Sequence, residues 1–335
     1  MALDLETRDQ LIDTVRRFVA QRLRPLEAQV AENDAVPDDV IAEMRELGLY
    51  GLSIPEEYGG LDLSMEDECL VAIELGRTSP AFRSAFGTNV GIGSQGLVMF
   101  GTDDQKRRYL PGIASGEIIT SFALTEPEAG SDSAAVQTKA SRDGDAYVLN
   151  GMKRFITNAN KAHLFTVMTR SDPDKKGAAG VTAFLVQRDL PGLSVGKPEK
   201  KMGQQGAHIC DVIFDNVRVP IENRLGSEGE GFKVAMQVLD RGRLHISAVC
   251  IGVAERLIKD CVEYAGERKQ FGQPISGFQL IQGMIADCKT ESMAAKALTM
   301  ETARKRDAGE NVTLEAAAAK YFASEMVGRV ADRAV

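Results

Sequence analysis

The sequence holds few of the residues that bind metal ions or form disulfide bridges. Its 335 residues include five cysteines and three histidines. No pair of cysteines has C-x-x-C spacing and no pair of histidines has H-x-x-x-H spacing, so we predict no metal site. An odd, dispersed set of cysteines is typical of free thiols in a reducing compartment. The residues concerned are Cys69, Cys210, Cys250, Cys261 and Cys288, and His163, His208 and His245.

The chain also lacks an excess of basic charge and a long apolar run. Its formal net charge of −8 argues against a nucleic-acid partner, because such proteins present a basic surface. This net charge is compatible with an anionic small substrate, since the binding of such a substrate depends on a local Lys/Arg patch. No segment is apolar enough to span a bilayer, and the acidic start at Asp4 does not resemble a signal peptide. We therefore predict a cytoplasmic protein without membrane insertion.

Two common motifs of enzymes are missing as well. No G-x-G-x-x-G follows a strand, and the glycines at 226, 229 and 231 have another spacing and precede a helical pattern. No G-x-S-x-G nucleophile elbow occurs. The sequence thus gives no support for a Rossmann-type dinucleotide site or an α/β-hydrolase.

The apolar periodicity that is present divides the chain into three parts. Residues 5 to about 117 show helical spacing, with capping patterns at Ser64/Asp67 and Thr102/Gln105. Between about 118 and 224 short alternating runs are separated by turn dipeptides such as Asp143-Gly144, which predicts a small antiparallel barrel or sandwich. From Gly231 long helical patterns return and predict an antiparallel bundle. We predict an α+β multidomain chain with domains at 1–117, 118–224 and 225–335.

The stretch from Phe122 to Asp132 has the character of a ligand site. An apolar run enters it, and then the side chains become small or turn-forming. Thr125 and Ser131 offer hydroxyls, and Gly130 allows another surface to come close to the backbone. Such a loop suits a flat cofactor with polar edges, although a plain surface loop has the same composition.

Five ordered motifs, the first of which is this stretch, resemble those of the acyl-CoA dehydrogenases. The other four are the segments at 150–158, 201–203, 225–232 and 268–272. The resemblance covers essentially the whole chain. It implies the fold order just described, with a C-terminal four-helix bundle of which three helices are visible. It also implies an enzyme, an oxidoreductase with FAD as its cofactor that forms an α,β double bond in an acyl-CoA thioester.

The resemblance assigns residues to the flavin and to the substrate. Its flavin-ring residues are Phe122, Leu124, Thr125, Gly130, Ser131, Phe155, Ile156 and Thr157. For Phe155 and Ile156, packing inside the barrel is the alternative. Four residues are expected to reach the FAD of a neighbouring subunit: Arg268, Phe271, Phe278 and Gln279. This expectation implies a homo-oligomer, and the resemblance suggests a homotetramer. Ser131, Asp240 and Arg243 are the substrate candidates, and an Asp240–Arg243 ion pair within one helix is the alternative for the last two.

The catalytic base is not found among these residues. The resemblance places it on a Glu beyond Val335, so we expect the sequence to be a C-terminal truncation. Some relatives carry the base at the position of Gly242, which has no side chain to serve. A non-catalytic form that binds flavin or acyl-CoA therefore stays an alternative. The electron acceptor also stays open: it is either an electron-transfer flavoprotein or oxygen, as in flavin oxidases of this fold. The acyl chain length stays open as well.

Overall fold

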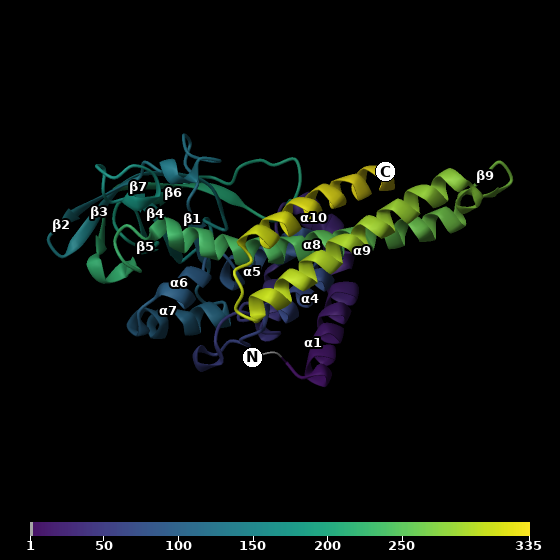
Figure 1. The fold of residues 1–335 in the computed structure, drawn as a ribbon, viewed down its shortest axis with the longest axis horizontal. Coiled ribbons are helices and arrows are strands. Elements are labelled where there is room, and N and C mark those ends of the chain that lie inside the picture. The colour runs from purple at the N-terminus through teal and green to yellow at the C-terminus, as the bar shows by residue number, and fades with distance from the viewer. Residues whose placement is uncertain (1–2) are drawn as a thin grey trace. The chain divides into compact units, whose positions relative to one another are not determined.

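A computed structural model describes residues 3–335 (Figure 1). The order of helical, β and helical segments is confirmed. The helices are α1 Leu5–Phe18, α2 Glu27–Asn33, α3 Asp38–Glu46, α4 Met65–Gly76, α5 Pro80–Val90, α6 Gln95–Phe100, α7 Asp103–Ser115, α8 Gly231–Glu267, α9 Gln279–Asp307 and α10 Thr313–Ala334. The strands are β1 Thr120–Ala123, β2 Lys139–Asp143, β3 Ala146–Thr157, β4 Leu164–Arg170, β5 Val181–Gln187, β6 Leu193–Val195, β7 Ile209–Pro220, β8 Arg224–Leu225, β9 Lys269–Gln270 and β10 Gln273–Pro274.

Two compact units contain these elements. The helical unit comprises residues 3–28, 63–83 and 240–335, and the sheet unit comprises residues 29–62 and 84–239. Helix α8 contributes residues to both, because residues 231–239 belong to the sheet unit. The predicted N-terminal domain is likewise divided between the two units.

The sheet unit is built on one eight-stranded mixed sheet. Its strand order is β6-β7-β3-β2-β4-β5-β8, and β1 pairs with β4. The β1–β4 and β2–β4 pairs are parallel, whereas the other pairs are antiparallel. The predicted all-antiparallel sheet is thus mixed, because the parallel β1–β4 pairing joins segments too far apart in sequence for local turn signals to predict it.

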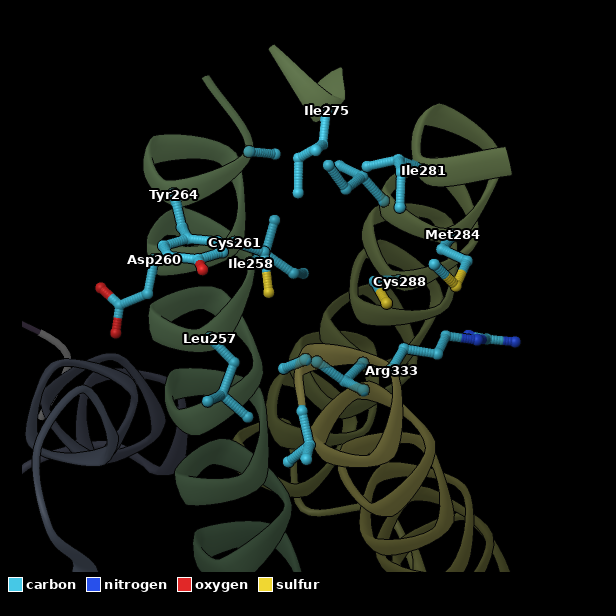
Figure 2. A pocket seen from close by; sticks show the side chains of 15 residues that line it. Leu257, Ile258, Asp260, Cys261, Tyr264, Ile275, Ile281, Met284, Cys288 and Arg333 are labelled. Carbon is cyan, nitrogen blue, oxygen red and sulfur yellow. The ribbon is translucent and has the colours of Figure 1, made fainter. Parts of the chain in front are cut away.

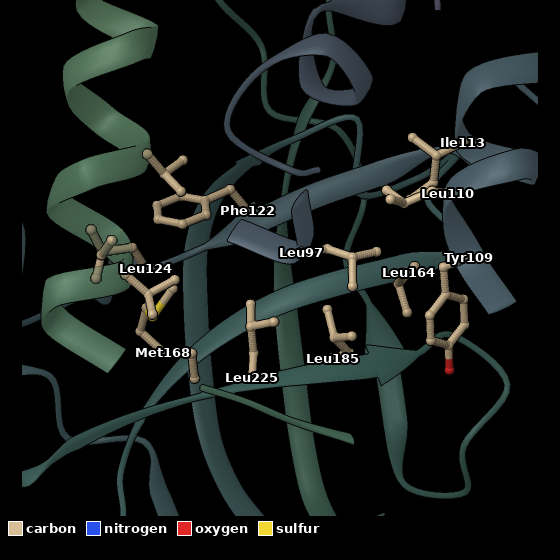
Figure 3. Packing of buried hydrophobic residues seen from close by; sticks show 14 of the residues in the cluster. Leu97, Tyr109, Leu110, Ile113, Phe122, Leu124, Leu164, Met168, Leu185 and Leu225 are labelled. Carbon is tan, nitrogen blue, oxygen red and sulfur yellow. The ribbon is translucent and has the colours of Figure 1, made fainter. Parts of the chain in front are cut away.

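Alternating side chains of the strands form two cores in this unit. On β4, Leu164 and Met168 join one cluster, while Phe165 and Val167 join the other. The period of two places alternate residues on opposite faces of a strand. Figure 3 shows the first cluster, in which Phe122 of β1 lies beside helix α8 and residues of α6, α7 and neighbouring strands complete the core.

Local signals fixed the ends of several helices. At Arg24-Pro25 the helix changes through a π-helical segment, Val19–Leu23, and a 3-10 turn, Arg24–Leu26, before α2 begins. A proline removes one backbone donor, so the regular helix cannot pass through it unchanged.

A long-range contact caps helix α4. Asp307 at the end of α9 accepts the N–H groups of Met65 and Glu66 within the helical unit.

The predicted capping box at the start of α7 is present and provides a first test. Thr102 Oγ1 accepts from Gln105 N at 3.2 Å, and Gln105 Oε1 accepts from Thr102 N at 3.0 Å. We expect Thr102→Ala to lower the free energy of unfolding by about 1 kcal/mol, because one helix N–H loses its acceptor. Thr102→Ser keeps the acceptor and is the matched control. Urea unfolding of both variants measures the effect, and equal losses would contradict it.

Candidate functional site

Two segments predicted to contact the flavin lie side by side in the sheet unit. The first is β1 with its following loop, and the second is the end of β3. Arg154 N donates to Thr125 O at 2.8 Å, and Ser121 Oγ donates to Thr157 O at 2.7 Å. These two bonds hold the backbone of both segments together. The structure therefore brings Thr125 and Thr157 into one region, and both side chains are partly exposed there.

A buried ion pair supports this junction, and it was not predicted in the sequence analysis. Lys153 Nζ lies 2.7 Å from Glu126 Oε1 and donates to Leu124 O at 3.0 Å. The side chains of Lys153 and Glu126 are 0% and 4% exposed. Glu126 also accepts the backbone N–H groups of Gln137 and Thr138 at 2.6 and 2.9 Å. The only signal for this pair was the presence of acidic residues in the first motif, Glu126 among them, and of basic residues in the second, Lys153 among them.

Burial and charge act in opposition on this pair. Burial lowers the pKa of Lys153 to about 8, and the Glu126 charge resists that shift. For Glu126 burial tends to raise the pKa, but the attraction and hydrogen bond of Lys153, with the bonds from Thr138 and Gln137, outweigh it, so its pKa is lowered. The carboxylate is thus ionised at neutral pH and held by three donors, which makes the loop rigid where it meets β3.

The predicted ring residues divide into exposed and buried ones. Gly130 and Ser131 are exposed, and a Cβ added at Gly130 would meet no atom within 4 Å. Phe122 and Leu124 are each 8% exposed and belong to the core of Figure 3. Ile156 is 2% exposed and its side chain packs in the second core, so the alternative of barrel packing holds for this side chain. A strand alternates, and Ile156 points opposite to its neighbours.

Phe155 is the unusual residue of this region. Its φ of +59° lies in the left-handed region, which a bulky residue rarely adopts. The register of the β3–β7 pair shifts between Lys153 and Ile156, so Phe155 sits at an irregularity of the strand. Its ring is 52% exposed, and the Arg154 guanidinium lies 5.2 Å from its centroid. Barrel packing is therefore wrong for Phe155, which presents a flat ring at the surface beside Thr157.

The residues predicted to serve a neighbouring subunit lie in the helical unit, around the β9–β10 hairpin that links α8 to α9 (Figure 1). Arg268 and Gln279 are exposed, and the Phe271 side chain is 92% exposed. Phe278 contacts Phe271 edge to face, with ring centroids 6.0 Å apart. Phe271 and Phe278 therefore form an aromatic pair at the hairpin, with the Phe271 ring almost fully in solvent.

The two substrate candidates on α8 contact each other. Arg243 donates to Asp240 in a short ion pair, as the helical alternative predicted. Thr313 Oγ1 donates to the other carboxylate oxygen of Asp240 at 2.7 Å. Asp240 is buried, whereas the Arg243 side chain is 32% exposed. Of the pair, Arg243 is therefore the side chain that is accessible to a ligand.

A second group of buried charges in the helical unit was not predicted. Arg241 of α8 donates to the buried Glu68 of α4. One helical turn further along α8, His245 Nδ1 lies 2.6 Å from Arg83 Nη2 of α5. Residues 241 and 245 share one helix face, which the i, i+4 spacing could have indicated. Their partners come from other helices, and no local pattern identifies those.

The helical unit also contains an apolar cavity of about 440 Å³ (Figure 2). Side chains of α8, α9 and α10 line it, including Leu257, Tyr264, Met284, Cys288 and Arg333. None of the predicted site residues lies there. Within residues 3–335 no cluster of His, Cys, Asp and Glu could hold a metal ion, and no helix is long and apolar enough to cross a membrane.

Comparisons with known proteins agree with this fold. The N-terminal, middle and C-terminal domain models of the acyl-CoA dehydrogenases match residues 6–117, 121–217 and 229–335. A probable acyl-CoA dehydrogenase of Bacillus subtilis is 38% identical over 336 residues, covering 100% of this chain and 88% of that protein. The structure of butyryl-CoA dehydrogenase from Megasphaera elsdenii is similar with a TM-score of 0.95 and 34% identity, covering 100% and 88%. A structure of PigA with FAD and proline has a TM-score of 0.95 and 27% identity, again covering 100% and 88%.

The helical, β and helical segments follow one another in this order, and a loop of hydroxyls and backbone groups lies beside an exposed aromatic ring. Together with the matched domains, these features define a flavin-dependent oxidoreductase. The chain belongs to the acyl-CoA dehydrogenase family. Its cofactor is FAD, and its activity is the dehydrogenation of acyl-CoA thioesters.

Proposed function

We propose that the junction of the β1 loop with the end of β3 is the flavin site of this dehydrogenase. The observation that carries the proposal is the pair of bonds at 2.8 and 2.7 Å that hold residues 121–125 beside residues 154–157. The residues fit the group. Thr125, Ser131 and Thr157 supply hydroxyls, Gly130 leaves open space, and Phe155 supplies a flat face. Bound FAD accepts the β-hydrogen of the acyl chain as a hydride.

In this scheme the residues of the chain position the cofactor and the substrate. The backbone around Phe122, Leu124 and Ile156 shapes the site from beneath, because their side chains are buried. Thr125 and Thr157 would orient the ring edges by hydrogen bonds, and Ser131 would contact the cofactor and the substrate. Asp240 pairs with Arg243, which we assign to the substrate. The α-proton leaves to a carboxylate, and no described residue is assigned to that role.

The wider assembly is part of the same proposal. Arg268, Phe271, Phe278 and Gln279 contact the FAD of a neighbouring subunit, which requires a homo-oligomer and is consistent with a homotetramer. The fully exposed Phe271 supports this, since an interface would cover it. Arg268 suits a diphosphate because its guanidinium is planar and permanently charged. We further propose an electron-transfer flavoprotein as acceptor, domain limits of 1–117, 118–224 and 225–335, and a cytoplasmic location, which five free thiols favour.

Anaerobic titration of the yellow protein with acyl-CoAs tests the proposal. We expect the flavin absorption near 450 nm to bleach with a matching acyl-CoA, because hydride transfer reduces the ring. Thr125→Val and Thr157→Val should each slow bleaching by about 10–100-fold, as one oriented hydrogen bond is worth about 1.5–3 kcal/mol when it involves charge. Thr14→Val is the control, because the Thr14 hydroxyl donates to Gln10 O within helix α1 and touches none of the proposed site residues.

A non-catalytic binding role is the second candidate, and the glycine at position 242 favours it. Yellow protein that binds acyl-CoA but never bleaches with any chain class would support this role and overturn the dehydrogenase. Protein that bleaches and then re-oxidises rapidly in air, with release of hydrogen peroxide, would instead identify an oxidase. Protein purified without flavin would contradict the cofactor site itself.

A further inference from the structure

The carbonyl group of Leu124 points into the protein rather than towards solvent. Lys153 Nζ donates to Leu124 O at 3.0 Å, and the lysine side chain is 0% exposed. No peptide bond between the described residues, 3–335, is cis. In a trans peptide the C=O of one residue and the N–H of the next point in opposite directions. The N–H of Thr125 therefore points away from Lys153.

The N–H of Thr125 is a free donor. The carbonyl of the same residue accepts from Arg154 N at 2.8 Å, so the peptide groups on both sides of Thr125 are held in place. Among residues 3–335, no group accepts a hydrogen bond from Thr125 N. Thr125 is also partly exposed. An N–H without an acceptor at such a position is satisfied by water or by a ligand.

The charge of Lys153 acts on this donor through a single peptide group. A cation at the oxygen of a peptide draws electron density towards it, and the N–H of the same peptide becomes a stronger donor. Burial lowers the pKa of Lys153 to about 8, and Glu126, 2.7 Å away, opposes this shift, so the lysine stays protonated at neutral pH. Glu126 accepts the N–H groups of Gln137 and Thr138, which fixes the position of the pair.

We propose that Lys153 is a positioning residue of the flavin site, and that it strengthens the Thr125 N–H as a donor to the reduced form of the cofactor. Reduction by a hydride adds negative charge to the flavin ring. A donor that is fixed in place and strengthened by a cation binds the more negative form more tightly, and so favours reduction. This inference rests on the proposed function, in which Thr125 contacts the ring edge. It adds a physical cause for the ease with which the bound flavin is reduced.

The midpoint potential of bound FAD tests the proposal. In Lys153→Met we expect reduced FAD to lose about tenfold more affinity than oxidised FAD, which lowers the two-electron potential by about 30 mV. Equilibration with a reference dye of known potential, with FAD in excess, measures the potential. Fluorescence titration of the apoprotein with oxidised FAD and with dithionite-reduced FAD measures the two dissociation constants, so the result does not depend on turnover.

Two further variants separate the charge of Lys153 from its packing. Lys153→Gln removes the charge but keeps an N–H donor beside Glu126, so it tests the proposal even if the methionine variant does not fold. It should lower the potential as Lys153→Met does. Lys153→Arg keeps a cation near Leu124 O and should recover at least half of the lost potential.

The control removes a cation from another buried ion pair. Arg241→Met leaves the buried Glu68 of the helical unit without its partner. This variant should lose stability but keep the wild-type potential of bound FAD. A purely structural role of Lys153 would weaken the binding of both redox forms equally, so the ratio of the two dissociation constants distinguishes the two roles.

Two results would overturn the inference. The first is a Lys153→Gln variant that binds both redox forms of FAD in the wild-type ratio. The second is an Arg241→Met variant whose potential falls as far as that of the Lys153 variants, which would attribute the shift to lost stability. The proposed flavin site fails separately. Hydrogen–deuterium exchange of residues 120–128 in the wild type should slow when FAD binds, and unchanged exchange would place the cofactor elsewhere.

Discussion

Replacing Lys153 with methionine is expected to lower the free energy of unfolding by about 3–5 kcal/mol, because the variant leaves the buried Glu126 carboxylate without its counter-ion. Methionine has a similar length, so the change removes the charge with little change in packing. Lys153 also donates to Leu124 O, and this bond is lost with it. The loop that bears Thr125 then loses its side-chain attachments to β3 and keeps the bond from Arg154 N, and we expect the variant to retain much less FAD.

Urea unfolding and the ratio of 450 to 280 nm absorbance of purified protein measure both effects. Lys175→Met is the matched control, since Lys175 pairs with Asp172 at 3.2 Å but is 63% exposed. An exposed pair is worth about 0–1 kcal/mol, so this control should lose little. If Lys153→Met unfolds at the same urea concentration as Lys175→Met and holds as much flavin, the ion pair has no role in the site.

The stability of the helical unit is expected to fall between pH 5 and pH 8 because of Glu68. Burial is the main reason that the pKa of Glu68 is raised from 4.5 to about 7, while the charge and hydrogen bond of Arg241 oppose the shift. Asp307 adds to the rise, and Arg306 opposes it. A carboxyl whose pKa is raised in the folded state binds its proton more tightly there than in the unfolded chain. Its contribution to stability is therefore complete below pH 4.5 and is lost as the pH rises through 7.

Glu68→Gln should remove this dependence. A shift of this size corresponds to about 3 kcal/mol, so the free energy of unfolding of the variant minus that of the wild type should rise by about that amount from pH 5 to pH 8. Urea unfolding at four pH values measures the difference. Glu66→Gln is the matched control, because it makes the same chemical change two residues earlier on α4. A Glu68→Gln difference that stays constant with pH would mean that Arg241 keeps the carboxylate ionised throughout.

The sequence predicted the fold well where a periodic pattern and a local stop signal coincided. The helical pattern was expected to return from Gly231, and helix α8 begins at this residue. Strands β6 and β8 were not predicted, since three and two residues are too few to show alternation. The parallel pairing of β1 was missed for a different reason, because its partner lies beyond two intervening strands.

Within the site, the residues of the two motifs were easier to predict than the buried side chains that support them. Thr125 and Thr157 could be named because the two motifs that carry them resemble the flavin segments of the acyl-CoA dehydrogenases. The exposed ring of Phe155 could not be separated from a core position, since only a φ of +59° and a shift in register turn it outward. Contacts such as Lys153–Glu126 and Arg83–His245 join residues far apart in the chain, and a single sequence contains no signal for such pairs.

The way in which β1 joins the sheet has a consequence for the order of folding. The β2–β3 and β4–β5 hairpins join neighbouring segments, so they can form early and quickly. Thr120 must pair with Leu164, and this contact closes a long loop that includes both β2 and β3. The loop after β1 reaches its place against β3 only when that closure is complete. During refolding, affinity for the cofactor should therefore appear after most of the strand content, and free FAD added at the start should speed the last phase rather than the first.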